Sequence, residues 1–326
     1  MRALLWVVLG VAGLWAGYWF VGAQAVERGA ERVFAEAAAR GLEARNDDLR
    51  VAGFPNRFDL TVTAPQVFDP VSGYGWQGPD LRLLAMTWKP WHLIALAPDA
   101  SVITTPFGPV NLTAQDLRAS VVLRPGDDLA LRSTVVEATG LTVAGPLGLV
   151  SLARASFATA LDTSRRNSHR IGLQVTDLTP GPAAAAAMPD LPAVLSGLRL
   201  DAHVLLSGPL DRHAAATRPE VAGLVLDEAR LDWGPLQVAA KGRLATTSDG
   251  TAEGRIDLQI ENWRLLPAVL GQSGLIDPVL APTLLRAFEI MAEGSPDLTT
   301  ALTFRSGRAS LGPLPIGVAP RLAYRQ

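Results

Sequence analysis

A charge-free segment from Ala3 to Ala23 constrains this chain more than any other feature of its sequence. Its length matches the roughly 20 apolar residues that a helix needs to cross the hydrocarbon of a bilayer. A buried helix of a soluble protein would not need so long a stretch without charge. The segment therefore predicts a transmembrane anchor over residues 1–23.

The residues that flank this anchor indicate its orientation. Arg2 precedes the segment without a neighbouring acid, and Tyr18, Trp19 and Phe20 cluster near its far end, where aromatic rings favour the headgroup region. This arrangement predicts a single-pass protein of the inner (plasma) membrane with its body in the periplasm. The alternative is secretion to the periplasm after cleavage following Ala25, because Ala23-Gln24-Ala25 fits the small-x-small pattern. The apolar stretch exceeds the roughly 7–15 residues typical of a signal peptide, so we favour a retained anchor.

A short amphipathic segment follows the anchor. Val26, Val33, Phe34 and Ala37 recur near helical spacing with charged residues between them, and Gly41 is a suitable residue to end a helix. We expect a linking helix over residues 24–41 that caps the following sheet or lies on the membrane surface.

From about Leu49 the hydrophobic pattern changes to a period of two. In the segment 57–63, Phe58, Leu60 and Val62 alternate with polar residues. The same alternation recurs in the segments 117–121, 198–204, 255–261 and 298–304. Such a pattern is typical of antiparallel strands with one face in water. Seven Gly-Pro pairs supply turn signals between the segments.

The chain of 326 residues exceeds the usual size of one compact core. The stretch from Pro180 to Pro192, which contains an alanine tract, is the best candidate for a boundary. It predicts an N-terminal β-rich half over residues 49–180 and a C-terminal β-rich half over residues 181–326. Helical apolar spacing in the segments 265–274 and 278–293 predicts two short helices that pack on the sheet of the second half.

Several classes of function find no support in the composition. The net charge is −2 and no basic run occurs, which argues against a nucleic-acid partner. The chain has no cysteine, and its four histidines are far apart without metal-ligand spacing. We therefore expect no catalytic residues, no metal, no cofactor and no enzymatic activity. His203 shares a strand face with Asp201, which allows a base and its orienting acid, although a surface pair between strands is the favoured interpretation.

One motif carries a family resemblance. Gly53-Phe54-Pro55-x-Arg57-Phe58-Asp59-Leu60, after an anchor and a short helix, resembles the signature of an uncharacterised proteobacterial family, the domain of unknown function 2125. The family has Tyr where this chain has Phe54. Further matching segments include Trp88-Lys89-Pro90 and the closing run 307–317. From its residues alone, the motif is a strand start with proline where no ladder donor is needed. Since the family has no assigned activity, the resemblance implies organisation only.

A more distant likeness extends this expectation to the fold. The alternating strands and the single N-terminal helix are similar in style to AsmA-like envelope proteins. That analogy implies a large curved antiparallel sheet with a few short packing helices, whose apolar concave face handles lipid.

Two functional hypotheses follow. The first is a protein that binds or shields lipid, phospholipid included, along an open apolar groove, which would contain Phe58, Leu60, Val62, Leu200, Ile256 and Leu258. The second is a non-enzymatic scaffold or assembly factor of the cell envelope in which helices close the same apolar face. The two differ in whether that face is open.

Overall fold

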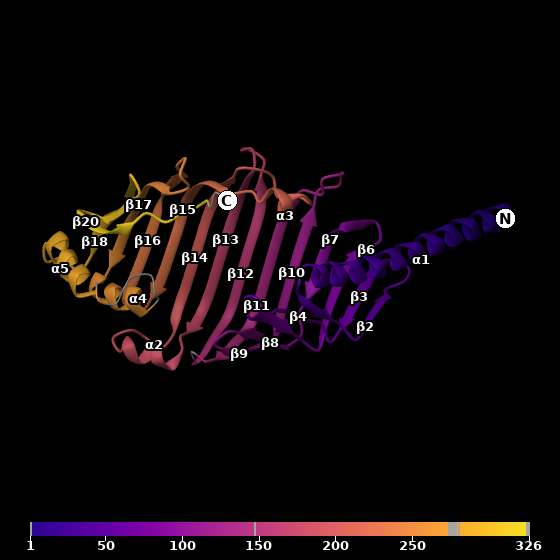
Figure 1. The fold of residues 1–326 in the computed structure, drawn as a ribbon, viewed down its shortest axis with the longest axis horizontal. Coiled ribbons are helices and arrows are strands. Elements are labelled where there is room, and N and C mark those ends of the chain that lie inside the picture. Colours follow the sequence, from indigo (N-terminus) through magenta and orange to yellow (C-terminus); the bar gives the residue numbers. More distant parts are fainter. Residues whose placement is uncertain (1, 147, 273–278, 280, 324–326) are drawn as a thin grey trace. The chain divides into compact units, whose positions relative to one another are not determined.

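The computed structural model describes residues 2–146, 148–272, 279 and 281–323. Its described residues form a mainly β protein in which 20 strands join one antiparallel sheet, with a long N-terminal apolar helix and a few short helices (Figure 1). This confirms the predicted fold class. The contacts divide the chain into unit 1 (Met1–Arg124 and Val136–Pro146) and unit 2 (Pro125–Val135 and Leu147–Gln326).

Helix α1 (Arg2–Ala39) is continuous, whereas the sequence interpretation divided it at residue 23 into an anchor and a linking helix. Its apolar and its charged segments both have helical spacing and no proline stands where they meet, so the helix continues past Gly22 into the charged segment. Among the described helices, α1 is long and apolar enough to span a membrane or to act as a signal, and its apolar part is almost wholly exposed.

Unit 1 contains ten complete strands and residues 136–145 of β11 (Leu131–Gly145). The complete strands are β1 (Glu43–Arg45), β2 (Asp48–Ala52), β3 (Arg57–Thr63), β4 (Gln66–Asp69), β5 (Tyr74–Gln77), β6 (Asp80–Met86), β7 (Lys89–Leu96), β8 (Ala100–Thr105), β9 (Gly108–Thr113) and β10 (Asp116–Leu123).

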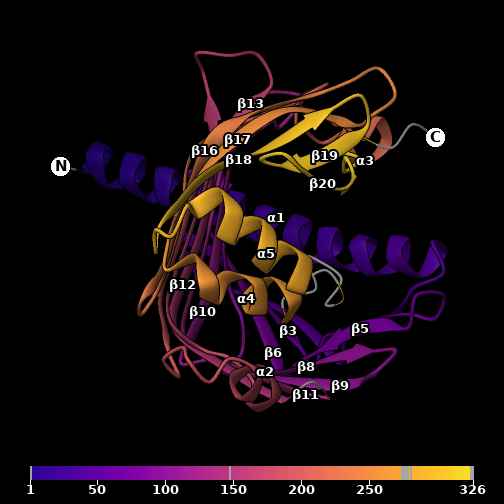
Figure 2. The ribbon, with the colours of Figure 1, turned by 90° about the vertical axis from the view of Figure 1, so that its left-hand side faces the viewer.

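The strands of unit 1 form two rows. One row has the order β2-β3-β6-β7-β10 and the other the order β1-β4-β5-β8-β9-β11. The rows meet at an angle (Figure 2), where hydrogen bonds from Ala64 N to Pro79 O (2.8 Å) and from Gly78 N to Pro65 O (3.2 Å) keep them joined. The pair Gly78-Pro79 therefore bends the chain where it passes from β5 in one row to β6 in the other, and does not reverse the chain as a hairpin turn would.

Unit 2 is a simpler meander of long strands. Its pairings follow chain order without interruption from β12 to β20. The strands are β12 (Gly148–Asp162), β13 (Ser168–Thr179), β14 (Leu195–Leu206), β15 (Val221–Trp233), β16 (Leu236–Thr246), β17 (Ala252–Glu261), β18 (Leu298–Arg305), β19 (Arg308–Leu311) and β20 (Leu314–Val318).

Short helices stand in the connections between the strands of this meander. They are α2 (Pro182–Ala187), α3 (Ala214–Thr217), the short 3₁₀ helix η1 (Trp263–Leu265), α4 (Leu266–Gln272) and α5 (Ala281–Ala292). Figure 2 shows α4 and α5 under the arch of β16–β18. Leu284 and Phe288 of α5 are buried with Leu236, Ile260 and Trp263 in the largest core cluster. The predicted helices 265–274 and 278–293 thus occur as η1, α4 and α5, and their residues 273, 274, 278 and 280 lie outside the described part.

The division of the chain also differs from the expected boundary at residue 180. The stretch after Pro180 forms α2 and a turn that connect β13 directly to β14, its hydrogen-bonded neighbour inside unit 2. A connection rich in alanine and proline looks like a linker in sequence, but here it joins two strands of one sheet. The contacts divide instead within β11, between residues 135 and 136.

Candidate functional site

The family-like motif lies against the aromatic residues of α1. Phe58 of β3 is 5% exposed and forms a core cluster with Trp19 and Ala23 of the helix. The Trp19 and Phe58 rings stack with centroids 6.2 Å apart, and Phe54 meets Trp19 edge-on at 5.4 Å. Aromatic pairs in these geometries add attraction beyond the area that they bury. The motif thus holds the helix on the sheet.

Three hydrogen bonds join the same surfaces. Donors on α1 bind backbone carbonyls of unit 1: Trp15 Nε1 binds Pro55 O (3.0 Å), Tyr18 Oη binds Thr87 O (2.7 Å) and Trp19 Nε1 binds Arg57 O (2.7 Å). These carbonyls belong to the turns after β2 and β6 and to the start of β3. We call Trp15, Tyr18, Trp19, Phe54 and Phe58 the aromatic clasp.

Glycines make this close approach possible. A Cβ on Gly22 would lie 2.5 Å from the Phe58 ring, so the helix needs glycine there to reach the sheet. Gly53 has φ +98° and a Cβ there would lie 2.9 Å from Arg57 O, so the tight turn also needs glycine. Arg57 forms an ion pair with Asp59 at 2.8 Å. The motif residues Gly53, Phe54, Pro55 and Arg57 therefore have structural reasons for their identity.

The alternation of the sequence gives unit 2 one apolar face. Residues opposite one another on paired strands share a face, and one row runs from Phe157 through Leu173 and Leu200 to Ala229. Its continuation through Ala240 reaches Leu258 of β17, which packs on the core under α5. A parallel row contains Ile171, Ala202, Leu226, Gly242 and Ile256.

Part of this face lies beyond the reach of α4 and α5. Five of the apolar residues that β12–β14 place on this face are only half-buried and belong to none of the buried clusters or their packing partners among the described residues. The principal contacts of β13 and β14 are with neighbouring strands. We call these five residues the apolar strip: Phe157, Ile171, Leu173, Leu200 and Val204.

The six residues of the expected groove lie in different environments. Phe58, Leu60 and Val62 are 5%, 4% and 3% exposed in unit 1, which leaves a ligand little surface. Leu200, Ile256 and Leu258 are half-buried in unit 2. Leu200 belongs to the apolar strip, Leu258 packs on the cluster that α5 covers, and Ile256 packs on a separate cluster around Ala252 and Phe304.

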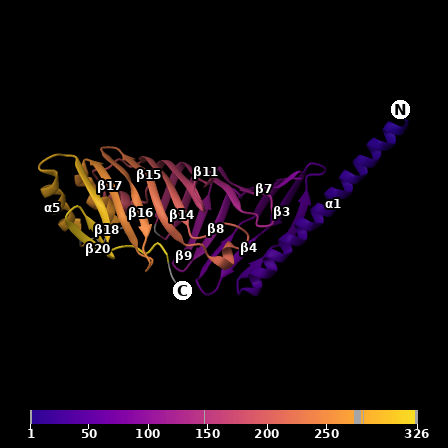
Figure 3. The ribbon, with the colours of Figure 1, turned by 90° about the horizontal axis from the view of Figure 1, so that it is seen from above.

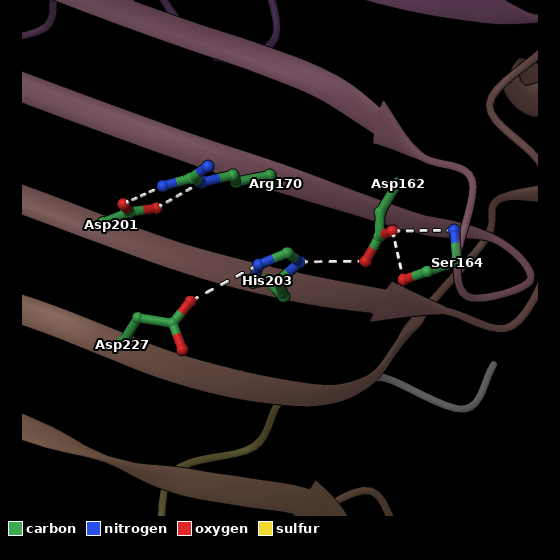
Figure 4. Close-up of polar contacts among 6 residues, drawn as sticks. All are labelled: Asp162, Ser164, Arg170, Asp201, His203 and Asp227. Carbon is green, nitrogen blue, oxygen red and sulfur yellow. Dashed lines mark hydrogen bonds and ion pairs between the residues drawn. The ribbon is translucent and has the colours of Figure 1, made fainter.

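The opposite face of unit 2 carries a network of charged side chains (Figure 4). Arg170 donates two hydrogen bonds to Asp201, at 2.8 and 2.5 Å. The ring of His203 lies between two carboxylates, with Nδ1 3.0 Å from Asp162 and Nε2 3.4 Å from Asp227. Asp201 is therefore the partner of Arg170, and the surface pairing between strands describes it better than a base with its orienting acid.

Local hydrogen bonds set the electrostatics of this network. The Ser164 hydroxyl, 2.6 Å from Asp162, lowers the pKa of that carboxyl, and Arg170 lowers the pKa of Asp201. Both nitrogens of His203 face carboxylates, so the ring is held within this network between strands. The described residues hold no group of three or more His, Asp and Glu placed to bind a metal.

A cavity also lies largely on this polar side. It has a volume of about 810 Å³ and is lined by residues of β15–β18 that include Glu228, Lys241, Asp257 and Gln259. Lys241 and Asp257 are directly opposite one another on β16 and β17. Opposite charges at directly paired positions stabilise a sheet.

The aromatic clasp is the feature that sequence reasoning missed. Trp15, Tyr18, Trp19 and Gly22 recur at intervals of three or four, which places them on one side of a helix. The sequence interpretation instead assigns Tyr18, Trp19 and Phe20 to the headgroup region at the end of a transmembrane segment. The motif 53–58 was interpreted separately, because no local signal links two segments 40 residues apart.

Comparison with known proteins agrees with this organisation. A bacterial family described as "Uncharacterized protein conserved in bacteria (DUF2125)" matches residues 19–320. No curated protein matches the chain.

Proposed function

The chain belongs to the DUF2125 family, an uncharacterised bacterial family that supplies no activity to transfer. We therefore propose a function from the geometry of the chain itself. The protein is a non-enzymatic, membrane-anchored sheet that holds lipid acyl chains against its apolar strip. Helix α1 keeps the protein at the inner membrane, with the body in the periplasm. Neither a cofactor nor a nucleic acid takes part.

One observation carries this proposal. The apolar strip lies on the face that α4 and α5 cover elsewhere, yet its side chains are half-buried and outside every core cluster of the described residues. Contiguous apolar surface that a fold leaves uncovered usually marks an interaction site. An acyl chain gains free energy there by leaving water, in proportion to the apolar area that it covers.

Unit 1 offers a similar surface by itself. The row that begins at Phe58 continues through Ala85 to Leu93, and Leu93 is 41% exposed. Near α1 this face is covered, and further along the row it is not. Both units thus present partly uncovered apolar rows, which is the property that the lipid hypothesis requires.

A pair of matched variants tests the proposal. Leu200 belongs to the apolar strip, whereas Val225 is half-buried on the next strand and faces the other way, directly opposite His203. The full chain is purified from bacterial envelopes in a mild detergent, and bound phospholipid is quantified by mass spectrometry. We expect L200Q to carry several-fold less phospholipid than V225Q, because only L200Q places a polar group in the apolar strip. Lipid bound around α1 is common to both variants and cancels in the comparison.

A photoactivatable phospholipid provides the second measurement. Its acyl chain should crosslink to peptides of β12–β14 in the wild-type protein. Equal lipid content in L200Q and V225Q, together with no crosslink on these strands, would contradict the proposal. The envelope scaffold with protein partners would then be the better hypothesis.

A further inference from the structure

We propose that the edge of unit 1 beside the aromatic clasp is itself a membrane-binding surface: the turns 53–56 and 87–88 insert into the interfacial region of the phospholipid bilayer alongside α1. This inference needs α1 to cross the bilayer but does not depend on lipid at the apolar strip.

The first argument is the length of the helix. Between Arg2 and the clasp, the free part of α1 runs from Ala3 to Leu14, which are 12 residues and span about 18 Å at 1.5 Å per residue. The hydrocarbon of a bilayer is about 30 Å thick and needs about 20 residues. A span that starts after Arg2 therefore ends near Gly22, within the segment that the sheet holds.

The contacts of the clasp then fix the depth of the turns. Trp15 and Tyr18 precede Gly22 by seven and four residues, which correspond to about 10 and 6 Å along the helix axis. Trp15 binds Pro55 O and Tyr18 binds Thr87 O, so the turns lie at the same levels as these rings. Figure 3 shows the free part of α1 extending away from β3. The turns therefore reach below the membrane surface by about the depth of an interfacial helix.

The exposed residues of this edge have the chemistry of a membrane interface. Phe54 of the clasp is 54% exposed. Trp88, Met86 and Phe20, which are neighbours of clasp contacts in sequence, are 56%, 42% and 60% exposed. Lys89, one of only two lysines in the chain, follows Trp88 directly. Aromatic rings favour the headgroup level, and a nearby cation attracts anionic lipid.

The hydrogen bonds of the clasp support the same placement. A backbone carbonyl without a partner is costly at membrane depth, because hydrocarbon supplies no donor. The carbonyls of Pro55, Arg57 and Thr87 each accept a hydrogen bond from a ring of α1. Thr87 itself is fully buried, and its hydroxyl binds Asn56 O at 3.2 Å. The side chains of α1 thereby supply hydrogen-bond donors to the carbonyls of the turns that would enter the bilayer with the helix.

Single cysteines can test this directly, because the natural chain has none. Asn56 and Trp88 are exposed on the two turns, so N56C and W88C place a label at the proposed interface. Val71 and Phe107 are 95% and 81% exposed on the turns after β4 and β8, in the other row of unit 1. V71C and F107C are the matched controls.

The full-length variants are labelled with an environment-sensitive fluorophore and reconstituted into vesicles of phosphatidylcholine with brominated acyl chains. We expect quenching of at least twofold at residues 56 and 88, and almost none at residues 71 and 107. Quenching at residues 56 and 88 as weak as at the two controls would overturn the inference and leave α1 as the sole membrane contact. The lipid content of L200Q is measured separately, so failure of either proposal is recognised independently.

Discussion

His169 shows how a single residue can make the stability of unit 2 depend on pH. Its side chain is 4% exposed on β13, with Nδ1 3.3 Å from the Thr159 hydroxyl, and burial lowers its pKa. The folded state thus favours the neutral ring, while the unfolded chain binds a proton near the ordinary pKa of about 6.5. Stability from this group is fully present above that pH and is lost as the pH falls toward the folded-state pKa.

We predict that acidification from pH 7.5 to 5.5 lowers the unfolding temperature of the wild-type protein more than that of H169Q. The slope that His169 contributes is at most about 1.4 kcal/mol per pH unit. Glutamine can still bond to Thr159 but does not titrate. H213Q changes an exposed histidine and is the control. Thermal unfolding followed by circular dichroism measures the effect, and equal pH dependence in wild type and H169Q would rule out this role.

At the scale of elements, α5 shows which side chains hold a helix on the sheet. Phe288 is fully buried and meets Trp263 edge-on at 5.8 Å, whereas Ile290, two residues later, is 78% exposed. We predict that F288A lowers the free energy of unfolding by about 3–5 kcal/mol, because it leaves a cavity in the core. I290A should change it by less than about 0.5 kcal/mol. Urea denaturation compares the two, and similar losses would mean that α5 is not docked as described.

The strands show how far sequence patterns reach. The alternation over 57–63, 198–204, 255–261 and 298–304 predicts β3, β14, β17 and β18. Successive side chains of a strand point to opposite faces of the sheet, so the residues of one strand are enough to show the pattern. The Gly-Pro pairs are less informative. Gly234-Pro235 and Gly312-Pro313 reverse the chain in hairpins, but Gly78-Pro79 only bends it between β5 and β6. The local signal is the same in each case, and only pairing with distant strands decides between them.

The candidate sites follow the same division between local and distant information. Leu200 and Leu258 could be assigned to one apolar face from alternation alone, and the structure places them in one register row. Phe58 has the same pattern, yet α1 covers it. Whether an apolar row is open depends on which helix packs on it, and this information is absent from the row itself. The boundary within β11 was unpredictable for a similar reason, since one strand contributes to both units.

At the scale of the whole molecule, the aromatic clasp makes α1 part of the folded body of unit 1. Cleavage after Ala25 would remove Trp15, Tyr18 and Trp19 and would leave the Phe58 ring uncovered. Loss of a buried tryptophan contact alone costs about 3–5 kcal/mol. We therefore expect the protein to keep its helix, and intact-mass measurement of protein extracted from envelopes should show residues N-terminal to Trp15.

Two truncated chains separate docking from membrane anchoring. A chain that starts at Leu14 keeps the whole clasp but lacks most of the free apolar segment, whereas a chain that starts at Gln24 lacks the clasp as well. In one detergent, the Leu14 chain should unfold at nearly the same temperature as the full-length protein. The Gln24 chain should unfold at least several degrees lower, because Phe58 and the carbonyls of Pro55, Arg57 and Thr87 lose their partners. Equal unfolding temperatures for the two truncated chains would show that α1 is dispensable for the fold and would make the cleaved, secreted form the better interpretation.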